Sequence, residues 1–173
     1  MTNKKTRFLV EGATVAAIYA AMTLAIYPLS YGALQLRFSE AMTVLPVFTP
    51  AAIPGLTIGC IVANLAGPMS WIDAVFGGIA TLLAALSSYF TRNIRIKNAP
   101  LLSLAFPVIF NAIIIGLEIN LFFLPEGEVF TFMGFLISAL WVGLGEAVVC
   151  FLLGTPLALA LDKSRIFKKG VIR

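Results

Sequence analysis

The sequence has no histidine, and only two cysteines and two aspartates, among its 173 residues. Histidine is the commonest general base and the commonest metal ligand in proteins, so its absence removes the usual means of acid–base and metal catalysis. Asp162 is expected at the cytoplasmic end of a span and Asp73 near the outer face, so the two do not form an aspartyl pair. Cys60 and Cys150 lie inside apolar segments, where a cysteine is typically a small packing residue. We therefore expect neither an enzyme nor a metal site.

A phosphate-binding loop is also missing. The sequence contains no G-x-x-x-x-G-K-[ST] motif, and all of its lysines lie outside the apolar runs. The chain therefore lacks the usual loop for binding ATP, and we expect no cofactor. If the protein takes part in active transport, the energy must come from an ion gradient or from ATPases on other subunits.

Charged residues are scarce. They make up 12% of the chain, whereas hydrophobic residues make up 60% and the mean hydropathy is +1.00. A soluble domain has about twice this charged share, and apolar runs of about 20 residues are typical of membrane spans. We predict an all-α membrane protein, a single domain of six transmembrane helices in a compact bundle. The expected spans are residues 7–27, 39–48, 51–65, 71–90, 100–124 and 129–161, with a bend or exit from the membrane near Gly154 and Pro156.

The basic residues are distributed unevenly between the two predicted faces. With six spans, 11 of the 12 basic residues lie on the side that carries both termini, whereas Glu126 and Glu128 lie in an opposite connection. The positive-inside rule then predicts cytoplasmic N- and C-termini in a protein of the cell membrane. The pI of 9.3 does not indicate nucleic-acid binding, because the basic residues sit at the ends of spans.

Arg37 is the one basic residue on the predicted outer side. It lies in residues 35–55, a stretch in which Gln35, Arg37 and Glu40 precede an apolar run interrupted by three prolines. One interpretation is a headgroup anchor or a snorkelling side chain. The interpretation we favour is a polar site that opens outward, with residues 35–40 as its rim and lid and the prolines as a structural hinge.

Polar residues inside the apolar spans are the other site candidates. A charged side chain near the bilayer centre costs about 2.5–3.5 kcal/mol, so such residues generally face the bundle interior or a ligand path. Glu118 and Asn111 are seven positions apart and share a helix face. The full set is Glu40, Asn64, Asp73, Asn111, Glu118, Asn120 and Glu146.

Three of these residues have structural alternatives. Asn64 is also suited to capping the end of its helix, and Asp73 to capping the start of the next one. Glu146, near the middle of the last span, is also suited to hydrogen bonding between helices. These roles stay open beside ligand contact.

Two tryptophans complete the candidate site. Trp71 lies at the expected outer boundary, where an interfacial belt is the usual role. Trp141 lies well inside the last span, where it either packs against lipid or stacks on a planar ligand. Carboxylates, amides and aromatics that open outward suit a flat heterocycle rich in hydrogen-bonding groups.

The first predicted span carries two rows of small residues at four-residue spacing. One row is Gly12, Ala16 and Ala20, and the next is Ala13, Ala17 and Ala21. Small residues at this spacing let another helix approach closely. The rows indicate either packing within the domain or a docking face for a partner protein in the membrane.

Two runs carry a resemblance to a known family. They are LQLRFSEAMTVLPVFTPAAIPGLTIGCIVANL at residues 34–65 and WIDAVFGGIATLLAAL at residues 71–86, and together they resemble the QueT family. The six-helix layout, with an A-x-x-x-A pattern in the first helix, is similar to a substrate-binding S component of an energy-coupling factor transporter.

The resemblance implies import of a queuosine precursor, a 7-deazaguanine such as the aminomethyl or cyano form, or queuine. It also implies a transmembrane coupling subunit and two ATPase subunits as partners. In this class the alanine pattern contacts the coupling subunit, which implies Ala13 and Ala17, or Ala16 and Ala20, in this chain.

Residues and resemblance together give a hypothesis for the site. A carboxylate, Glu118 or Glu40, pairs with the amidine-like edge of the base. An asparagine takes the ring carbonyl, a tryptophan stacks on the ring, and the loop with Arg37 closes over it; the asparagine is one of Asn64, Asn111 and Asn120, and the tryptophan is Trp71 or Trp141. One alternative is a proton-coupled permease that works without ATPases, with Glu146 and Glu118 as its proton relay. Another is an assembly subunit that does not transport.

Overall fold

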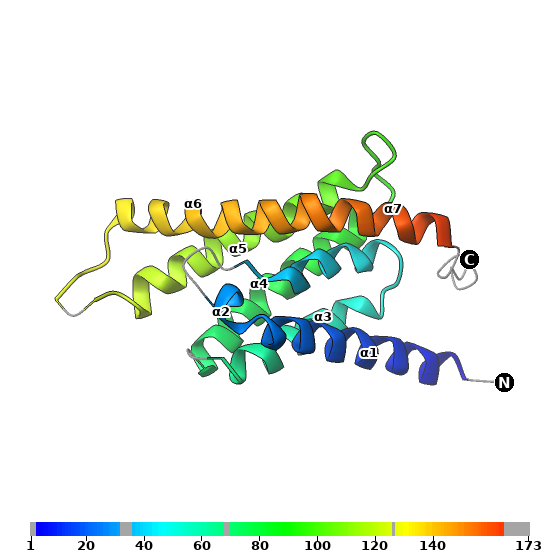
Figure 1. The fold of residues 1–173 in the computed structure, drawn as a ribbon, viewed down its shortest axis with the longest axis horizontal. Coiled ribbons are helices and arrows are strands. Elements are labelled where there is room, and N and C mark those ends of the chain that lie inside the picture. Colours follow the sequence, from blue (N-terminus) through cyan, green and yellow to red (C-terminus); the bar gives the residue numbers. More distant parts are fainter. Residues whose placement is uncertain (1–2, 32–35, 68–69, 126, 165–173) are drawn as a thin grey trace.

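The structure is a computed structural model that describes residues 3–31, 36–67, 70–125 and 127–164 (Figure 1). Over these residues every regular element is a helix, which confirms the all-helical prediction. The elements in chain order are α1 (Lys4–Ala25), α2 (Tyr27–Ser30), the 3-10 helix η1 (Phe38–Val47), α3 (Ala52–Leu65), α4 (Ser70–Phe90), α5 (Leu101–Phe122), α6 (Phe132–Val149), the π-helix η2 (Cys150–Gly154) and α7 (Thr155–Ser164).

Four helices in the described part of the chain are long and apolar enough to cross a membrane. They are α1, α4, α5 and the continuous helix from α6 through α7. The other two predicted spans correspond to η1, with 10 residues, and α3, with 14 residues. Each of these reaches about 20 Å, less than the roughly 30 Å of a bilayer core. The chain is therefore a multi-pass membrane protein, and the count of six spans stays a prediction.

The last predicted span is one helical rod. α6 continues through η2 into α7, so the helix runs unbroken for 33 residues along one side of the bundle (Figure 1). A bend or an exit from the membrane was predicted near Gly154 and Pro156; the helix continues there, with π-helical winding over Cys150–Gly154. A proline has no N–H and its ring collides with the carbonyl four residues earlier. The π segment just before Pro156 is a local way to accommodate it within a continuing helix.

η1 lies at the centre of the bundle. It contacts α1, α3, α4, α5, α6, η2 and α7, and all of its residues except Phe38 are buried. Pro46 lacks the N–H that an α-helix needs at that position. The Thr43 hydroxyl donates to the Glu40 backbone carbonyl at 2.5 Å, and such side-chain bonds compete with α-helical pairing. Both features favour the tighter winding, and residues 48–51 then turn the chain into α3.

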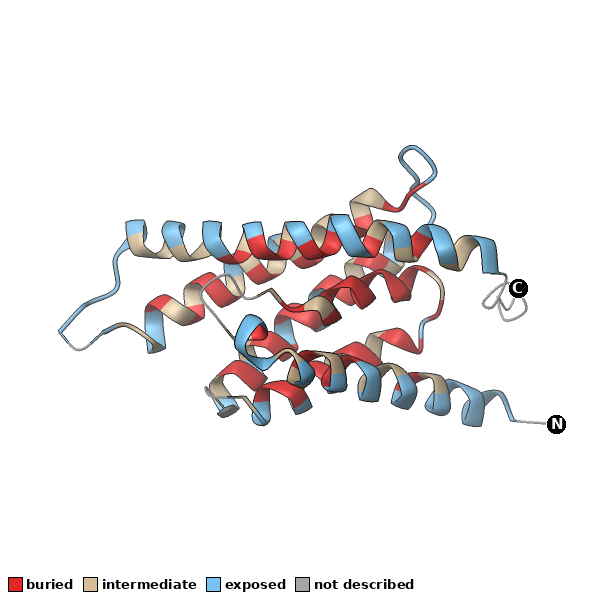
Figure 2. Cartoon of the chain, in the orientation of Figure 1, coloured by how far each residue is buried: buried red, intermediate tan, exposed pale blue. Residues whose placement is uncertain are grey.

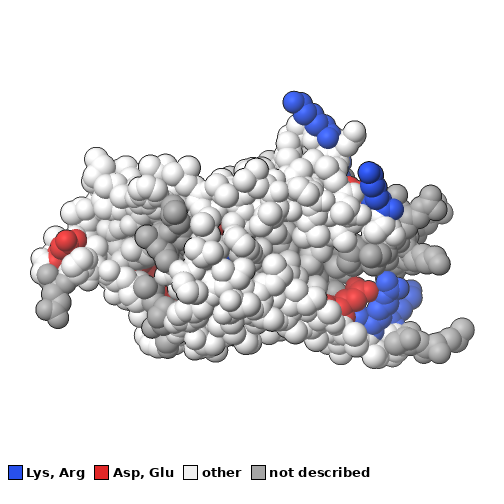
Figure 3. All heavy atoms as spheres, in the orientation of Figure 1, with Lys and Arg blue, Asp and Glu red and all other residues white. Residues whose placement is uncertain are grey.

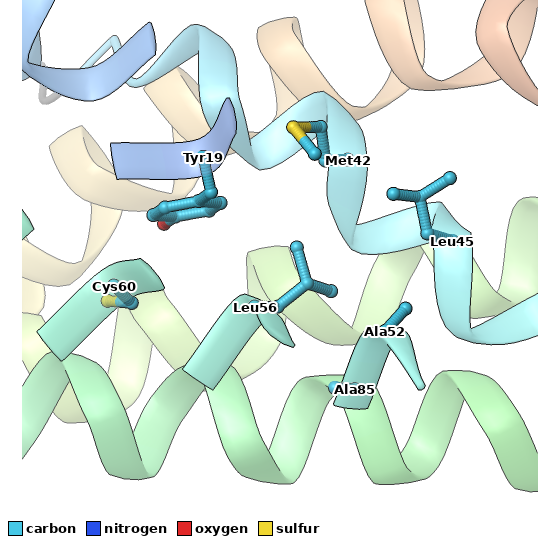
Figure 4. Close-up of a cluster of buried hydrophobic side chains, with 7 residues drawn as sticks. All are labelled: Tyr19, Met42, Leu45, Ala52, Leu56, Cys60 and Ala85. Atoms are coloured by element: carbon cyan, nitrogen blue, oxygen red, sulfur yellow. The ribbon is translucent and has the colours of Figure 1, made fainter. Parts of the chain in front are cut away.

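The long helices pack around η1 in chain order. α1 packs on α3, α3 on α4, α4 on α5, and α5 on α6. Buried residues gather on the inner helices, whereas α1 and α6 are exposed on their outer sides (Figure 2). Figure 4 shows the apolar core that joins α1, η1, α3 and α4, formed by Tyr19, Met42, Leu45, Ala52, Leu56, Cys60 and Ala85.

The contact between α1 and α3 depends on small residues. A Cβ atom at Gly59 would lie 2.8 Å from the Ala16 backbone oxygen, and one at Gly55 would lie 2.7 Å from the Gly12 oxygen. Such contacts bring two helix backbones close together. The row of Gly12, Ala16 and Ala20 therefore serves packing inside the domain, whereas Ala13, Ala17 and Ala21 form a second row that is exposed.

The described ends of the chain lie close to one end of the bundle. The start of α1, the end of α7 and the connection between α4 and α5 all lie there (Figure 1). The basic side chains visible in Figure 3 also gather at this end. This distribution is the one that the positive-inside rule associates with a cytoplasmic face, and the orientation itself stays a prediction.

Candidate functional site

A cluster of polar side chains lies inside the bundle. We call Arg37, Glu40, Asn64, Asp73 and Glu118 the central cluster; each is at most 4% exposed. They come from η1 and its N-cap, from the last turn of α3, from the first turn of α4 and from α5. The fold thus brings together five of the residues expected to form a site.

Arg37 is the cation of this cluster. It precedes η1, and its guanidinium lies 5.3 Å from the centre of the Tyr31 ring, a cation–π distance. Its Nε donates to the Ser30 backbone carbonyl at 3.2 Å. No ion pair within 4 Å involves Arg37 among the described residues, although Glu40 and Asp73 both act on it electrostatically. Because Arg37 is buried inside the bundle, the interpretation as a member of a polar site fits better than that as a headgroup anchor.

Glu40 is held from α1. The Tyr19 hydroxyl donates to Glu40 Oε1, whereas Oε2 has no hydrogen-bond partner among the described residues. Nearby, the hydroxyls of Thr23 and Ser39 lie 2.7 Å apart and tie α1 to the start of η1. The hydrogen bond from Tyr19 holds the Glu40 carboxyl in place and leaves its Oε2 available to a ligand.

Glu118 is the least satisfied member of the cluster. It is fully buried, and neither of its carboxyl oxygens has a close hydrogen-bond partner among the described residues. The Asp73 carboxyl lies near enough to act on it as a side-chain hydrogen-bond partner as well as by its charge, and Arg37 acts on it by its charge. A buried polar group without a partner costs about 1–3 kcal/mol, and more if it is charged. Glu118 therefore has the geometry expected of a group that meets a ligand.

Asn64 bridges two helices. Its Nδ2 donates to the Asp73 backbone carbonyl at 2.8 Å, and its Oδ1 has no partner in the described part of the chain. The side chain therefore joins α3 to α4, and the end of α3 is instead closed by backbone bonds from residues 66 and 67. One acceptor of Asn64 remains available to a ligand.

A second polar group lies between α5 and the α6–η2 rod. Asn111 Nδ2 donates to Glu146 Oε1 at 2.9 Å, and the Cys150 thiol lies 3.7 Å from Glu146 Oε2. Cys150 also lies 3.8 Å from the Glu40 backbone carbonyl. These contacts match the interhelical role considered for Glu146. One amide N–H of Asn111 is already used in the hydrogen bond to Glu146.

Asn120 lies apart from the central cluster. Its Nδ2 donates to the Ser138 hydroxyl on α6 at 3.0 Å. It lines an open groove of about 510 Å³ at the α5–α6 connection, together with Glu128, Thr131 and Gly134 among others. Asn120 follows Glu118 by two residues on α5, so the two side chains point to different faces of the helix.

Neither tryptophan lies in the cluster. Trp71 is 65% exposed and Trp141 is 51% exposed, so both rings lie on the outside of the bundle. A lipid-facing or interfacial role suits these positions, and stacking on a buried ligand does not. Gln35, the remaining residue of the predicted rim, lies outside the described residues.

Two tyrosines near the cluster were not among the predicted residues. Tyr19 bonds Glu40, and the Tyr31 hydroxyl donates to the Ala63 backbone carbonyl at 2.6 Å while its ring lies beside Arg37. A sequence signal existed for Tyr19, because a tyrosine inside a span, away from the interfacial belt, needs a buried partner for its hydroxyl. Tyr31 sits at the expected boundary and gave no such signal.

The comparisons with known proteins point to one family. Residues 9–163 match the family described as QueT transporter. A curated relative, "Queuosine precursor transporter QueT" of Lactococcus lactis subsp. cremoris (strain MG1363), is 35% identical over 85 residues. That alignment covers 48% of this chain and 50% of the relative, so the chain spans about half the length of the relative it matches. No solved structure matches the chain.

Proposed function

The chain belongs to the QueT transporter family, and we propose that it is the substrate-binding subunit of an importer for a queuosine precursor. The observation that carries this proposal is the central cluster, in which buried polar atoms lack partners around Glu118 and Glu40. Buried polar groups in native proteins are nearly always hydrogen-bonded. A hydrogen-bonding ligand would supply the missing partners, and a 7-deazaguanine base has suitable groups.

The ligand's amidine-like edge pairs with a carboxylate of the cluster. Two parallel N–H donors on that edge match the two oxygens of Glu118, and such bidentate pairs are strong and directional. Glu40 is the alternative, with a single free oxygen. The ring carbonyl is taken by Arg37, of which only Nε is committed among the described residues, to the Ser30 carbonyl, whereas the amide group of each asparagine already gives an N–H to a protein partner.

An aromatic contact to the ring comes from a tyrosine in this proposal. Tyr31 lies beside Arg37 at the outer end of α3, and Tyr19 lies beside Glu40. Tyr19 is fully buried, whereas Trp71 and Trp141 lie on the outside of the bundle. Stacking on a tyrosine therefore replaces the expected stacking on Trp71 or Trp141.

Transport in this proposal is driven by ATPases on other subunits. The chain lacks a phosphate-binding loop, so a transmembrane coupling subunit and two ATPase subunits supply the energy at the cytoplasmic membrane. Vesicles that contain the complete complex should accumulate a labelled 7-deazaguanine base when ATP is supplied on the side of the membrane that carries the ATPases. Vesicles with this chain alone should not. ATP-independent accumulation driven by a pH gradient would instead identify a proton-coupled permease.

The coupling subunit docks on the exposed alanine row. Ala13 and Ala17 face outward from α1, whereas Ala16 and Ala20 point toward the rest of the domain. Membrane helices associate by close packing, so the exposed row offers the better surface.

Bulk on that row should disrupt the complex. Ala13→Leu is expected to reduce co-purification with the coupling subunit by about tenfold or more, since a loss of about 1.4 kcal/mol is tenfold in affinity, without loss of ligand binding. Ile18→Phe, which adds bulk to another exposed part of α1, is the matched control. Equal co-purification of Ala13→Leu and the control would contradict docking on this row.

A further inference from the structure

The central cluster has more carboxyl groups than cations. Glu40, Asp73 and Glu118 belong to it, and the Glu146 carboxyl is coupled electrostatically to Glu40 and Arg37. Arg37 is the single basic side chain buried in the described part of the chain. One guanidinium therefore faces four buried carboxyl groups.

The buried side-chain atoms without hydrogen-bond partners in the described residues are all oxygens. Among the described residues they are Glu40 Oε2, Asn64 Oδ1, both Glu118 oxygens, Asn120 Oδ1 and the Thr81 hydroxyl. Apart from the hydroxyl, they are amide oxygens, which only accept hydrogen bonds, and carboxyl oxygens, which only accept when the group is ionised. The interior thus presents acceptors in excess, and a ligand that satisfies them must bring donors.

A metal ion would be another way to satisfy buried carboxylates. Among the residues that the structure describes, no three acidic or cysteine side chains are grouped closely enough to hold one. Glu118 is instead bordered by one carboxyl group, Asp73, and by Arg37. Two facing carboxyl groups suit a compact organic cation with several N–H donors.

Building on the proposed function, we propose that the ligand is taken up as a cation, with a primary ammonium group held between Asp73 and Glu118. A primary alkylamine is protonated at neutral pH, as the lysine side chain is, and it presents three donors. Glu118 then holds the ammonium group and not the amidine-like edge. That edge takes the alternative carboxylate, Glu40, through its unpaired Oε2, and Asn64 Oδ1 accepts a further ring donor. A nitrile in place of the ammonium group adds only an acceptor and leaves Glu118 without its partner.

This proposal predicts an order of affinities among 7-deazaguanines. Isothermal titration of the purified chain should show that 7-aminomethyl-7-deazaguanine binds at least about tenfold more tightly than 7-cyano-7-deazaguanine, because the hydrogen bonds to a charged donor are lost. The uncharged 7-methyl compound, similar in size, should bind as weakly as the nitrile. Equal affinities, or tighter binding of the nitrile, would overturn the ammonium site but not the proposed function.

Binding of none of the three bases would instead overturn the proposed function itself. A variant then tests the position of the ammonium group. Asp73→Asn should reduce affinity for the aminomethyl compound by a larger factor than affinity for the cyano compound, so the difference between them shrinks. Glu128→Gln, an acidic residue in the exposed α5–α6 connection, should keep the full difference. An unchanged preference in Asp73→Asn would contradict the placement.

Discussion

Glu118→Gln should weaken binding of a 7-deazaguanine ligand about 10- to 100-fold. The variant keeps the size of the side chain but replaces one acceptor oxygen with an N–H₂ group, which then faces the donors of the ligand. A hydrogen bond to a charged group contributes about 1.5–3 kcal/mol, which converts to this range of affinity. Isothermal titration of the purified protein measures the effect directly.

The control for this experiment is Glu128→Gln. It removes one acidic charge from the exposed connection between α5 and α6 while leaving the central cluster unchanged. Glu40→Gln is the second informative variant, because Glu40 is the other carboxylate with an unpaired oxygen. Affinities that stay at the wild-type level in both Glu118→Gln and Glu40→Gln would rule out a carboxylate contact with the base.

Gly59→Leu is expected to destabilise the isolated protein more than any surface change on α1. A Cβ atom at this position would lie 2.8 Å from the Ala16 carbonyl oxygen and 3.1 Å from the Ala16 Cα, both backbone atoms. Backbone atoms cannot rotate away, so α1 and α3 must separate. Inserting extra carbons into a packed contact typically costs about 1–3 kcal/mol. Thermal unfolding in detergent, followed by circular dichroism, should show a clear fall in Tm.

Separation of these helices also affects the site. Tyr19 lies on α1 and donates to Glu40, so a shift of α1 withdraws that donor from the central cluster. Ligand binding by Gly59→Leu should therefore weaken together with stability. Ala13→Leu adds the same side chain to the exposed row of α1 and should leave Tm within about 1 °C of wild type. An equal fall in Tm for both variants would mean that the α1–α3 contact is not the cause.

Membrane residence and the location of helices follow from local properties of the sequence. The predicted limits of residues 71–90 and 100–124 lie within two residues of α4 and α5, because long apolar runs flanked by polar residues define such helices well. Residues 39–48 were expected as a short span, and η1 covers almost the same residues. Its 3-10 winding was not expected, because it depends on Thr43 reaching the Glu40 carbonyl and on the packing around it.

The residues of the candidate site were also predictable only in part from the sequence. Glu118 and Glu40 were identified because burying a charge in an apolar span is costly and therefore marks a function. Trp141 was identified by the same reasoning about depth, yet its ring faces outward. Depth along a helix can be read from the sequence, whereas the direction of a side chain around the helix depends on which neighbours pack there.

The sequence alone therefore determined that this chain is an all-helical membrane protein with few, scattered polar groups inside its apolar segments, because hydropathy and the cost of burying charge act residue by residue. The tertiary structure alone decided which polar groups meet. It joined Arg37, Glu40, Asn64, Asp73 and Glu118, set Asn120 apart and added Tyr19. It also decided which alanine row is exposed, because exposure depends on the helix packed against α1, here α3 with its two glycines.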